Sequence, residues 1–348
     1  MKGRKESSNM RIALDAMGGD HAPAVTVAGA IEAARTSSHS IILVGKEDVL
    51  AAELKKHAVV PSTISLQHAS EVITMDESPA QAVRQKRDSS LAVCSRMVAD
   101  GKADAFASAG NSGAAMASAL LYLRRIPGVI RPAIMTVFPT LTGHIAILDV
   151  GANTDCKPKN LVQFAVMGKT YFQDVFSVAN PRVGLLSIGE EESKGNELVL
   201  ETHELLRKTS LNFIGNVEGG DIAKGTADVI VCDGFVGNIV LKFGEGVAEM
   251  ILKLVKEEFK AHPFAWAALP FLWPVLKDIK KKMDYSEYGG ALLLGVDGVC
   301  VISHGKSNAK AIKNSVFAAA QFAEKNINKA IAKEITRLEE IEKSTVIS

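Results

Sequence analysis

One lysine with three neighbouring carboxylates stands out in this sequence as a group that could do chemistry. Lys194 follows Glu190, Glu191 and Glu192 in a loop that comes directly after the apolar run Val183 to Ile188. In open α/β sheets, ligands bind at loops that join a strand to a helix. Lys194 could therefore stabilise a phosphate or a developing oxyanion. It could equally be a solvated lysine paired with one of the glutamates.

Seven short loops rich in glycine, asparagine and aspartate recur, mostly between a predicted strand and a predicted helix. Glycines let the backbone approach a ligand, and a helix start offers free N–H groups to an anion, although turns need the same residues for structural reasons. Taken together, the loops predict a shared crevice for an anion or a polar ligand. They are Met17–Asp20, Ala109–Gly113, Gly151–Asn153, Lys194–Asn196, Gly219–Asp221, Asp233–Asn238 and His304–Ser307.

Four polar residues near these loops have more than one interpretation. Asn238 could begin a helix as its N-cap, or it could point its amide at a carbonyl oxygen. His304 could act as a base or donate to phosphate, although a loop histidine often does neither. Asp15 and Asp149 each end a predicted strand, where they could orient such donors or cap the next turn.

Several common catalytic arrangements are missing from the sequence. The loops contain no Walker pattern and no G-x-G-x-x-G, which counts against standard ATP or NAD binding. There is no Gly-x-Ser-x-Gly elbow and no H-E-x-x-H pair, so a covalent acyl-enzyme and a zinc hydrolase lack support. The four cysteines have no C-x-x-C spacing, which argues against a zinc site and favours buried thiols in a reducing cytosol. They are Cys94, Cys156, Cys232 and Cys300.

Composition sets further bounds. The 348 residues are 47% hydrophobic and can bury a large core. Forty basic and 39 acidic residues give a net charge of +1, which argues against a nucleic-acid binder. Residues 1–9 are polar and basic and are expected to form a flexible extension before the fold begins at Met10. No apolar run is long enough to span a bilayer.

Short β-branched runs alternate with longer helical segments, which predicts an α/β fold of three αβα layers around a mainly parallel sheet. We expect one catalytic domain over residues 10–348, closed by one long helix. Strands 133–138 and 144–149 are joined by a short turn that would allow antiparallel pairing. The predicted strands are 11–15, 40–44, 63–67, 104–107, 133–138, 144–149, 183–188, 212–214, 229–232 and 299–303.

A protruding αα-hairpin at about 244–286 is expected to interrupt this alternation. Gly246 to Lys260 carries an apolar stripe with helical spacing, and a basic helical pattern resumes over Leu276 to Met283. The segment between them holds both tryptophans and predicts an apolar tip. The expected tip residues are Phe264, Trp266, Phe271, Leu272 and Trp273.

The hairpin tip has four interpretations. Aromatic anchors beside lysines match an interfacial contact with a membrane. The same side chains could be buried against a second subunit, or the stems could dimerise while the tip contacts lipid. The lysines could also meet an acidic protein. They are Lys277, Lys280, Lys281 and Lys282.

Six segments resemble, in order, motifs of the bacterial phosphate acyltransferases of phospholipid synthesis. They are Met10–Pro23, Ala107–Ala114, Leu148–Asn153, Gly189–Asn196, Val217–Asp221 and Asp233–Asn238, and the resemblance covers the chain from Met10 onward. It implies an acyltransferase that moves an acyl group from acyl-acyl carrier protein to inorganic phosphate. It also implies a fold like the isopropylmalate-dehydrogenase and phosphotransacetylase group, a homodimer, and no metal or organic cofactor. The catalytic lysine and asparagine proposed for the family correspond to Lys194 and Asn238.

This chemistry agrees with the residues. Phosphate is already a nucleophile at neutral pH, so attack on a thioester needs positioning and oxyanion stabilisation rather than a serine or cysteine relay. We expect Lys194 and Asn238 to polarise the carbonyl or to hold phosphate. The other predicted substrate or phosphate contacts are Asp15, Gly18, Gly19, Gly110, Asn111, Ser112, Asn153, Gly195, Asn196, Gly237 and His304.

Partners and rival functions follow from the same features. The acidic carrier protein should meet a basic patch, either Arg84, Lys86 and Arg87 or the hairpin lysines. We expect a cytoplasmic enzyme that is peripherally associated with the membrane. A membrane glycerol-phosphate acyltransferase is a further candidate partner. The rival functions are a dehydrogenase of the same fold group and a non-catalytic, membrane-docked acyl sensor.

Overall fold

The computed structural model describes residues 9–262, 269–283, 287 and 289–347, and in this part of the chain one eleven-stranded sheet forms the centre of the molecule. The strand order is β3-β2-β1-β4-β11-β10-β5-β6-β9-β7-β8. The strands are β1 (Arg11–Asp15), β2 (Ser40–Gly45), β3 (Ile64–His68), β4 (Ala105–Ser108), β5 (Ala133–Pro139), β6 (His144–Leu148), β7 (Val183–Leu186), β8 (Phe213–Val217), β9 (Val229–Val231), β10 (Ala291–Leu294) and β11 (Cys300–Ile302).

The sheet consists of two parallel blocks that run in opposite directions. Strands β3, β2, β1, β4 and β11 are parallel to one another, and so are β6, β9, β7 and β8. Three antiparallel pairings, β11 with β10, β10 with β5 and β5 with β6, join the blocks and reverse their relative direction. The expected antiparallel pairing of 133–138 with 144–149 is therefore confirmed, and the sheet is mainly parallel.

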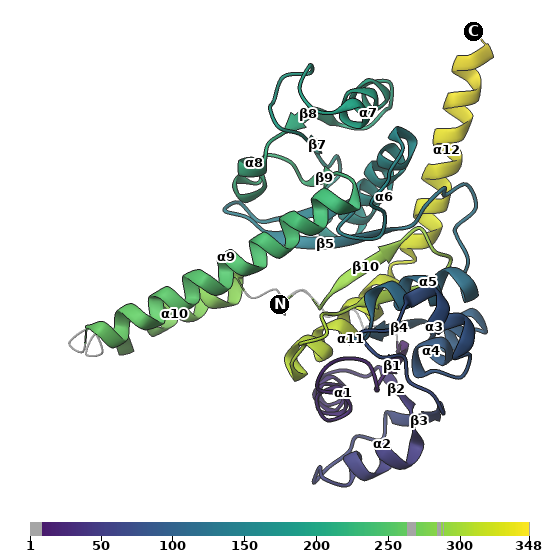
Figure 1. Cartoon of the computed structure of the whole chain (residues 1–348), viewed down its shortest axis with the longest axis vertical. Helices are drawn as coiled ribbons and strands as arrows, with labels where there is room; N and C mark the ends of the chain where they lie inside the picture. Colours follow the sequence, from purple (N-terminus) through teal and green to yellow (C-terminus); the bar gives the residue numbers. More distant parts are fainter. Residues whose placement is uncertain (1–8, 263–268, 284–286, 288, 348) are drawn as a thin grey trace, which may run out of the picture.

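Helices cover both faces of the sheet and produce the predicted three layers (Figure 1). Alternate strand residues point to opposite faces, as Ile12 and Leu14 join one core cluster while Ala13 joins the other. The first cluster packs against α1 (Ala24–Thr36), α2 (Glu47–Leu54), α6 (Pro158–Phe176), α7 (Glu197–Arg207), α11 (Ala309–Glu324) and α12 (Ile327–Ile347). The second packs against α3 (Pro79–Gln85), α4 (Ser90–Ala99), α5 (Ser112–Tyr122), α8 (Gly219–Lys224) and α9 (Gly234–Ala261).

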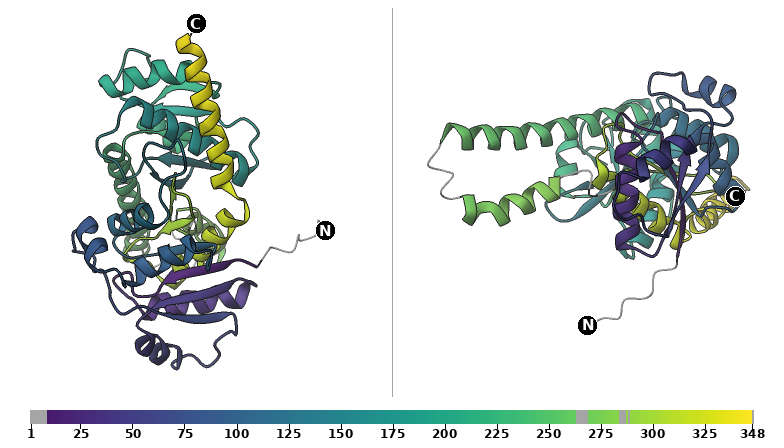
Figure 2. Two further views of the ribbon diagram at one scale, coloured as in Figure 1. Left: turned by 90° about the vertical axis from the view of Figure 1, so that its right-hand side faces the viewer. Right: turned by 90° about the horizontal axis from the view of Figure 1, so that it is seen from below.

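Two long helices, α9 and α10 (Leu269–Met283), extend side by side away from the sheet (Figures 1 and 2). They form the predicted αα-hairpin. None of the helices within the described residues is long and apolar enough to cross a membrane. Two of the predicted tip residues, Phe264 and Trp266, lie outside the described residues, as does the extension 1–9 apart from Asn9.

Several predicted boundaries are wrong, each for a local reason. Helix α9 begins at Gly234, well before the predicted 244, because Asp233 accepts hydrogen bonds from the N–H groups of Phe235 and Val236 as its N-cap. The N-cap interpretation of Asn238 is therefore wrong. Helix α10 begins at Leu269 and contains Pro274. The predicted single closing helix is α11 and α12, separated at Asn326, whose φ is 51°.

Two elements were missed at the sequence level. The run Ala291 to Leu294 forms β10, which lies in the middle of the sheet. The predicted loop at Gly219 to Asp221 is the start of α8, where a capping box joins Glu218 and Asp221. Both elements are short, so their periodicity is weak.

Candidate active site

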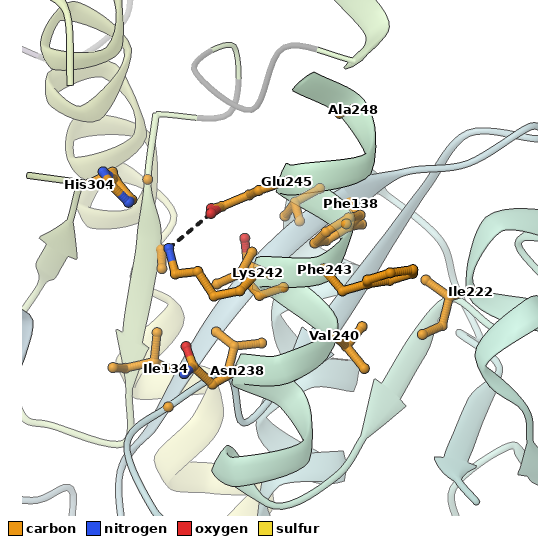
Figure 3. Close-up of a pocket in the computed structure, with 18 of the residues that line it drawn as sticks. Ile134, Phe138, Ile222, Asn238, Val240, Lys242, Phe243, Glu245, Ala248 and His304 are labelled. Carbon is orange, nitrogen blue, oxygen red and sulfur yellow. Dashed lines mark hydrogen bonds and ion pairs between the residues drawn. The ribbon is translucent and has the colours of Figure 1, made fainter. Parts of the chain in front are cut away.

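A cavity of about 560 Å³ lies on one face of the sheet, between the first turns of α9 and strands β5, β10 and β11 (Figure 3). It takes residues from five of the seven predicted loops. Because the two blocks of the sheet run in opposite directions, these loops meet on one face under α9 rather than along one edge. The lining residues that the argument uses are Ser112, Phe138, Gly151, Gly219, Ile222, Asn238, Lys242, Phe243, Gly244, Glu245, Ser303 and His304.

The carboxylate of Asp149 organises the loop that forms the floor of this cavity. Its Oδ1 accepts hydrogen bonds from the backbone N–H groups of Ile134, Gly151 and Ala152, at 3.0 to 3.2 Å. Its Oδ2 accepts from the backbone N–H and the side-chain amide of Asn153, at 2.7 and 2.8 Å. Burial raises the pKa of Asp149, while the N–H donors oppose that rise by stabilising the charged carboxylate.

The start of α9 is fixed against this loop. The N–H of Gly234 donates to the carbonyl of Asn153 at 2.7 Å. At Gly237, a Cβ would overlap the carbonyl oxygen of Asp149, so only glycine allows this close approach. The next residue, Asn238, brings its Oδ1 within 3.6 Å of the position that a Cβ would take on Gly151. The contact at Gly237 thus places the backbone of Asn238 at the cavity wall, with its side chain beside Gly151.

A second buried carboxylate orders the loops after β1 and β4. Oδ2 of Asp15 accepts the hydroxyl of Ser108 at 2.7 Å, and that hydroxyl accepts the N–H of Gly110 at 3.0 Å. Burial raises the pKa of Asp15, and the hydrogen bond from Ser108 opposes the rise. A Cβ on Gly18 would lie 2.8 Å from the nitrogen of Gly110, so the two loops approach closely at glycine. This cluster supports the segment that ends at the cavity-lining Ser112.

His304 enters the cavity from the loop after β11. Its Nδ1 accepts the backbone N–H of Lys306 at 3.1 Å. A neutral His304 therefore carries its proton on Nε2. The loop is tied to the one after β1, because the N–H of Asp20 donates to the carbonyl of Gly305 at 2.9 Å, and Gly19 lies against the same carbonyl.

Three of the predicted asparagines are engaged in structural hydrogen bonds. Asn111 caps α5 through Ala114 and donates to the carbonyls of Met75 and Glu77. Asn153 donates to Asp149 and to the carbonyl of Pro132. Asn196 caps α7 through the N–H of Val199. Their predicted contacts with phosphate stay predictions.

Lys194 lies apart from the cavity lining. It is exposed on the β7–α7 loop with Gly195 and Asn196, and its carbonyl accepts the hydroxyl of Ser187 at 3.2 Å. Glu192 pairs with Arg207 at 2.6 Å, and within the described part of the chain the ammonium of Lys194 forms no ion pair. The structure thus brings Asn238, Ser112 and His304 together and leaves Lys194 on a neighbouring loop.

The residues that sequence reasoning missed lie mainly on α9. Lys242, Phe243, Gly244 and Glu245 line the cavity together with Asn238. Once the N-cap at Asp233 is recognised, the i, i+4 spacing of Asn238 and Lys242 places them on one helix face. No comparable signal marks Phe138 or Ile222, whose positions depend on how β5 and α8 pack against α9.

Comparison with known proteins decides the family. The profile of a family described as "Fatty acid synthesis protein" matches residues 10–330. A phosphate acyltransferase from Endomicrobium trichonymphae is 60% identical over 332 residues, which cover 94% of this chain and 98% of that protein. One from Heliobacterium modesticaldum is 54% identical over 327 residues, with the same coverage. The chain belongs to the phosphate acyltransferase family. It is an acyltransferase of lipid synthesis, and the resemblance predicted from the sequence is confirmed.

Solved structures show the fold of this phosphate acyltransferase family member. A phosphotransacetylase from Streptococcus pyogenes aligns with a TM-score of 0.61 at 17% identity, covering 90% of this chain and 94% of its own. A 4-hydroxythreonine-4-phosphate dehydrogenase from Klebsiella pneumoniae aligns with a TM-score of 0.51 at 13% identity, covering 92% of this chain and 100% of its own. The predicted fold group is thus confirmed. Since both an acyltransferase and a dehydrogenase have this fold, the fold alone does not select the reaction.

Within the described residues the cysteines do not form disulfides, and three of the four are buried. Burial raises the pKa of the partly exposed Cys156 to about 12, which disfavours a reactive thiolate. The same part of the chain contains no cluster of three histidine, cysteine or carboxylate side chains that could hold a metal ion.

The contact between Gly237 and Asp149 gives a test of how Asn238 is positioned. Gly237→Ala should push the first turn of α9 away from the Gly151 loop and lower acyltransferase kcat by about 100-fold, the scale of a 1 Å misplacement. Gly246→Ala is the matched control, because a Cβ there meets nothing within 4 Å. It should leave kcat unchanged and, as a helix-interior glycine, raise Tm or leave it unaltered. Wild-type kcat in a folded Gly237→Ala enzyme would contradict this positioning role.

Proposed function

We propose that this enzyme transfers a fatty acyl group from the thioester of acyl-acyl carrier protein to inorganic phosphate, for phospholipid synthesis. The observation that carries the proposal is the division of the cavity into a polar and an apolar part (Figure 3). The polar part contains Ser112, Asn238 and His304, and the apolar part is formed by Phe138, Ile222 and Phe243. Such a division suits a thioester carbonyl joined to a hydrocarbon chain.

The polar part can support direct attack by phosphate. A phosphate oxygen forms the bond to the carbonyl carbon, the C–S bond breaks, and the carrier leaves as a thiolate that takes up a proton from water. The amide of Asn238 would donate to the carbonyl oxygen as negative charge develops there. The contacts of Gly234 and Gly237 fix the first turn of α9, so the backbone that carries Asn238 needs little reorganisation during the reaction. In this proposal Lys194 acts from the neighbouring β7–α7 loop as a second source of positive charge.

The apolar part would hold the acyl chain. In Figure 3, Val240 and Phe243 of α9 lie on the same side of the cavity as Phe138 of β5 and Ile222 of α8. A Cβ on Gly244 would lie 2.9 Å from the ring of Phe138, so the helix and the ring are already in close contact at this glycine. Buried methylene groups each contribute about 0.8 kcal/mol, so a long chain would gain substantial affinity here.

We favour the basic segment around α3 as the surface that docks the carrier protein. Pro79, at the start of α3, packs on Gly113 beside the cavity-lining Ser112. Arg84 and Arg87 are exposed, whereas Lys86 is engaged with Glu77 at 2.6 Å. An acidic carrier protein bound to the two arginines would place its acyl arm near the cavity mouth.

The hairpin is proposed to contact both a second subunit and a membrane. Large apolar side chains are exposed along α9 from Phe235 to Val255, which fits stems that pack against another copy of the chain. At the tip end of α10, Phe271 and Trp273 are 84% and 59% exposed. Lys277 is exposed one turn further on. This combination of aromatic groups and cations fits an anionic bilayer surface.

Product formation tests the reaction and the two catalytic assignments. Acyl-acyl carrier protein mixed with phosphate and wild-type enzyme should yield acyl phosphate, trapped as the hydroxamate. Asn238→Ala and Lys194→Ala should each lower kcat by about 100-fold or more, because each removes a donor to the developing charge. Lys208→Ala, on an exposed lysine that ends α7, serves as the control. A folded Lys194→Ala enzyme with near-normal turnover would remove that residue from the mechanism.

Gly244→Val tests the acyl-chain part of the cavity. Since even a Cβ here lies 2.9 Å from the Phe138 ring, valine should push that ring into the cavity, and hexadecanoyl transfer should fall by about tenfold relative to octanoyl transfer. Gly246→Val adds the same side chain two residues further on, where a Cβ meets no other atom within 4 Å. It should leave the ratio of the two kcat/KM values unaltered. If this ratio of kcat/KM values is unaltered in Gly244→Val as well, the acyl chain binds elsewhere.

Vesicle binding tests the hairpin tip. The wild-type protein should co-sediment with vesicles that contain anionic phospholipid, and the double variant Phe271→Glu/Trp273→Glu should remain in solution because it replaces apolar anchors with charges. Leu141→Glu is a suitable control, since Leu141 is 88% exposed on the β5–β6 turn and is not part of the hairpin tip. Equal co-sedimentation of all three proteins would argue against a membrane role for the tip.

A further inference from the structure

One ion pair lies in the wall of the cavity and has no role in the reaction proposed above. Nζ of Lys242 is 2.9 Å from Oε2 of Glu245 on α9. Among the described residues that line the cavity, Lys242 is the only lysine or arginine, and Glu245 is the only carboxylate. Any permanent charge that a ligand meets in this wall therefore comes from this pair.

Lys242 is placed beside the group that would polarise the carbonyl. It follows Asn238 by four residues, so the two side chains occupy the same face of α9 one turn apart. In Figure 3, the ammonium of Lys242 and the amide of Asn238 both turn toward the side of the cavity on which His304 lies. A ligand that reaches Asn238 thus comes within the field of this ammonium.

The chemistry of phosphate requires such a cation. Moving an anion from water into a cavity with mainly apolar walls is strongly unfavourable unless a fixed charge and hydrogen-bond donors compensate. Lys194, the cation expected from the sequence, does not line the cavity. The nearest positive charge that the described lining supplies to an anion in the cavity is therefore the ammonium of Lys242.

The ion pair is suited to exchange its partner. The side chain of Lys242 is 49% exposed, and that of Glu245 is 19% exposed. Because the Lys242 side of the pair is half exposed, the pair contributes little net stability, and the ammonium can leave Glu245 for a phosphate without a large penalty. While no anion is bound, Glu245 keeps the ammonium in the cavity wall and neutralises it.

We propose that Lys242 binds the phosphate substrate and that Glu245 competes with phosphate for the Lys242 ammonium. This inference rests on the proposed transfer to phosphate. It adds a phosphate-binding residue that is distinct from Lys194, and it predicts that the two members of one ion pair affect phosphate binding in opposite directions. A purely structural pair would not do so, because loss of either member would then weaken the same contact.

The test compares the apparent KM for phosphate across three variants. Lys242→Ala should raise it by about 10- to 100-fold, the scale of a lost hydrogen bond to a charged group. Glu245→Gln should lower it by about two- to fivefold, because a competing anion has been removed. Lys242→Arg should retain most of the affinity. The KM for acyl-acyl carrier protein should stay close to the wild-type value in all three.

A matched control is available on the same helix. Lys260 and Glu257 form another pair three residues apart, at 2.9 Å, and lie outside the cavity lining. Lys260→Ala and Glu257→Gln should leave both KM values unaltered. An unchanged KM for phosphate in Lys242→Ala overturns the proposal, and so does a rise in that KM in both Lys242→Ala and Glu245→Gln.

Direct binding separates this inference from the reaction on which it rests. Isothermal titration of inorganic phosphate into the wild-type protein and the Lys242→Ala variant needs no turnover, and the variant should bind at least about tenfold more weakly. Equal phosphate affinity in both proteins would overturn the role of Lys242. Absence of acyl phosphate from the wild-type reaction would instead refute the proposed function, whatever the titration shows.

Discussion

The site depends first on one buried carboxylate that gathers five N–H donors. Asp149 ends the β6 segment, and its oxygens accept from the start of β5 and from three consecutive residues of the following loop. Such a carboxylate is expensive to bury unless its hydrogen bonds are made, so the loop around Gly151 has little freedom to rearrange. Because Asn153 then accepts the N–H of Gly234, the same group fixes where α9 enters the cavity wall.

Helix α9 combines functions that would otherwise need separate elements. Its first turns carry an amide, an ammonium paired with a carboxylate, and the apolar residues that close the cavity over β5. These groups recur at helical spacing, so the position of the helix sets all of them at once. The close approach at Gly237 fixes the depth of the helix against Asp149, and the contact at Gly244 fixes its distance from Phe138.

The general architecture was accessible from the sequence, whereas the composition of the cavity was not. Alternating β-branched runs and helical stripes predicted the layers, the antiparallel β5–β6 pair and the hairpin, because these patterns depend on local periodicity. Short elements such as β10 and α8 lack that periodicity. Polar loops suggested one crevice, and Ser112, Asn238 and His304 do meet there. The roles of Lys242 and Phe138 depend on long-range packing, which residue spacing alone does not encode.

Exposed apolar side chains of α9 extend from the cavity into the hairpin. Phe243 lines the cavity and is 73% exposed, and Met250 and Leu254 continue the exposed apolar residues along α9. Monomeric proteins rarely leave an apolar surface of this extent uncovered. Whatever covers the stems of the hairpin must therefore also lie close to the apolar end of the cavity. The subunit contact and the acyl-chain binding proposed above would both remove water from apolar side chains of this one helix.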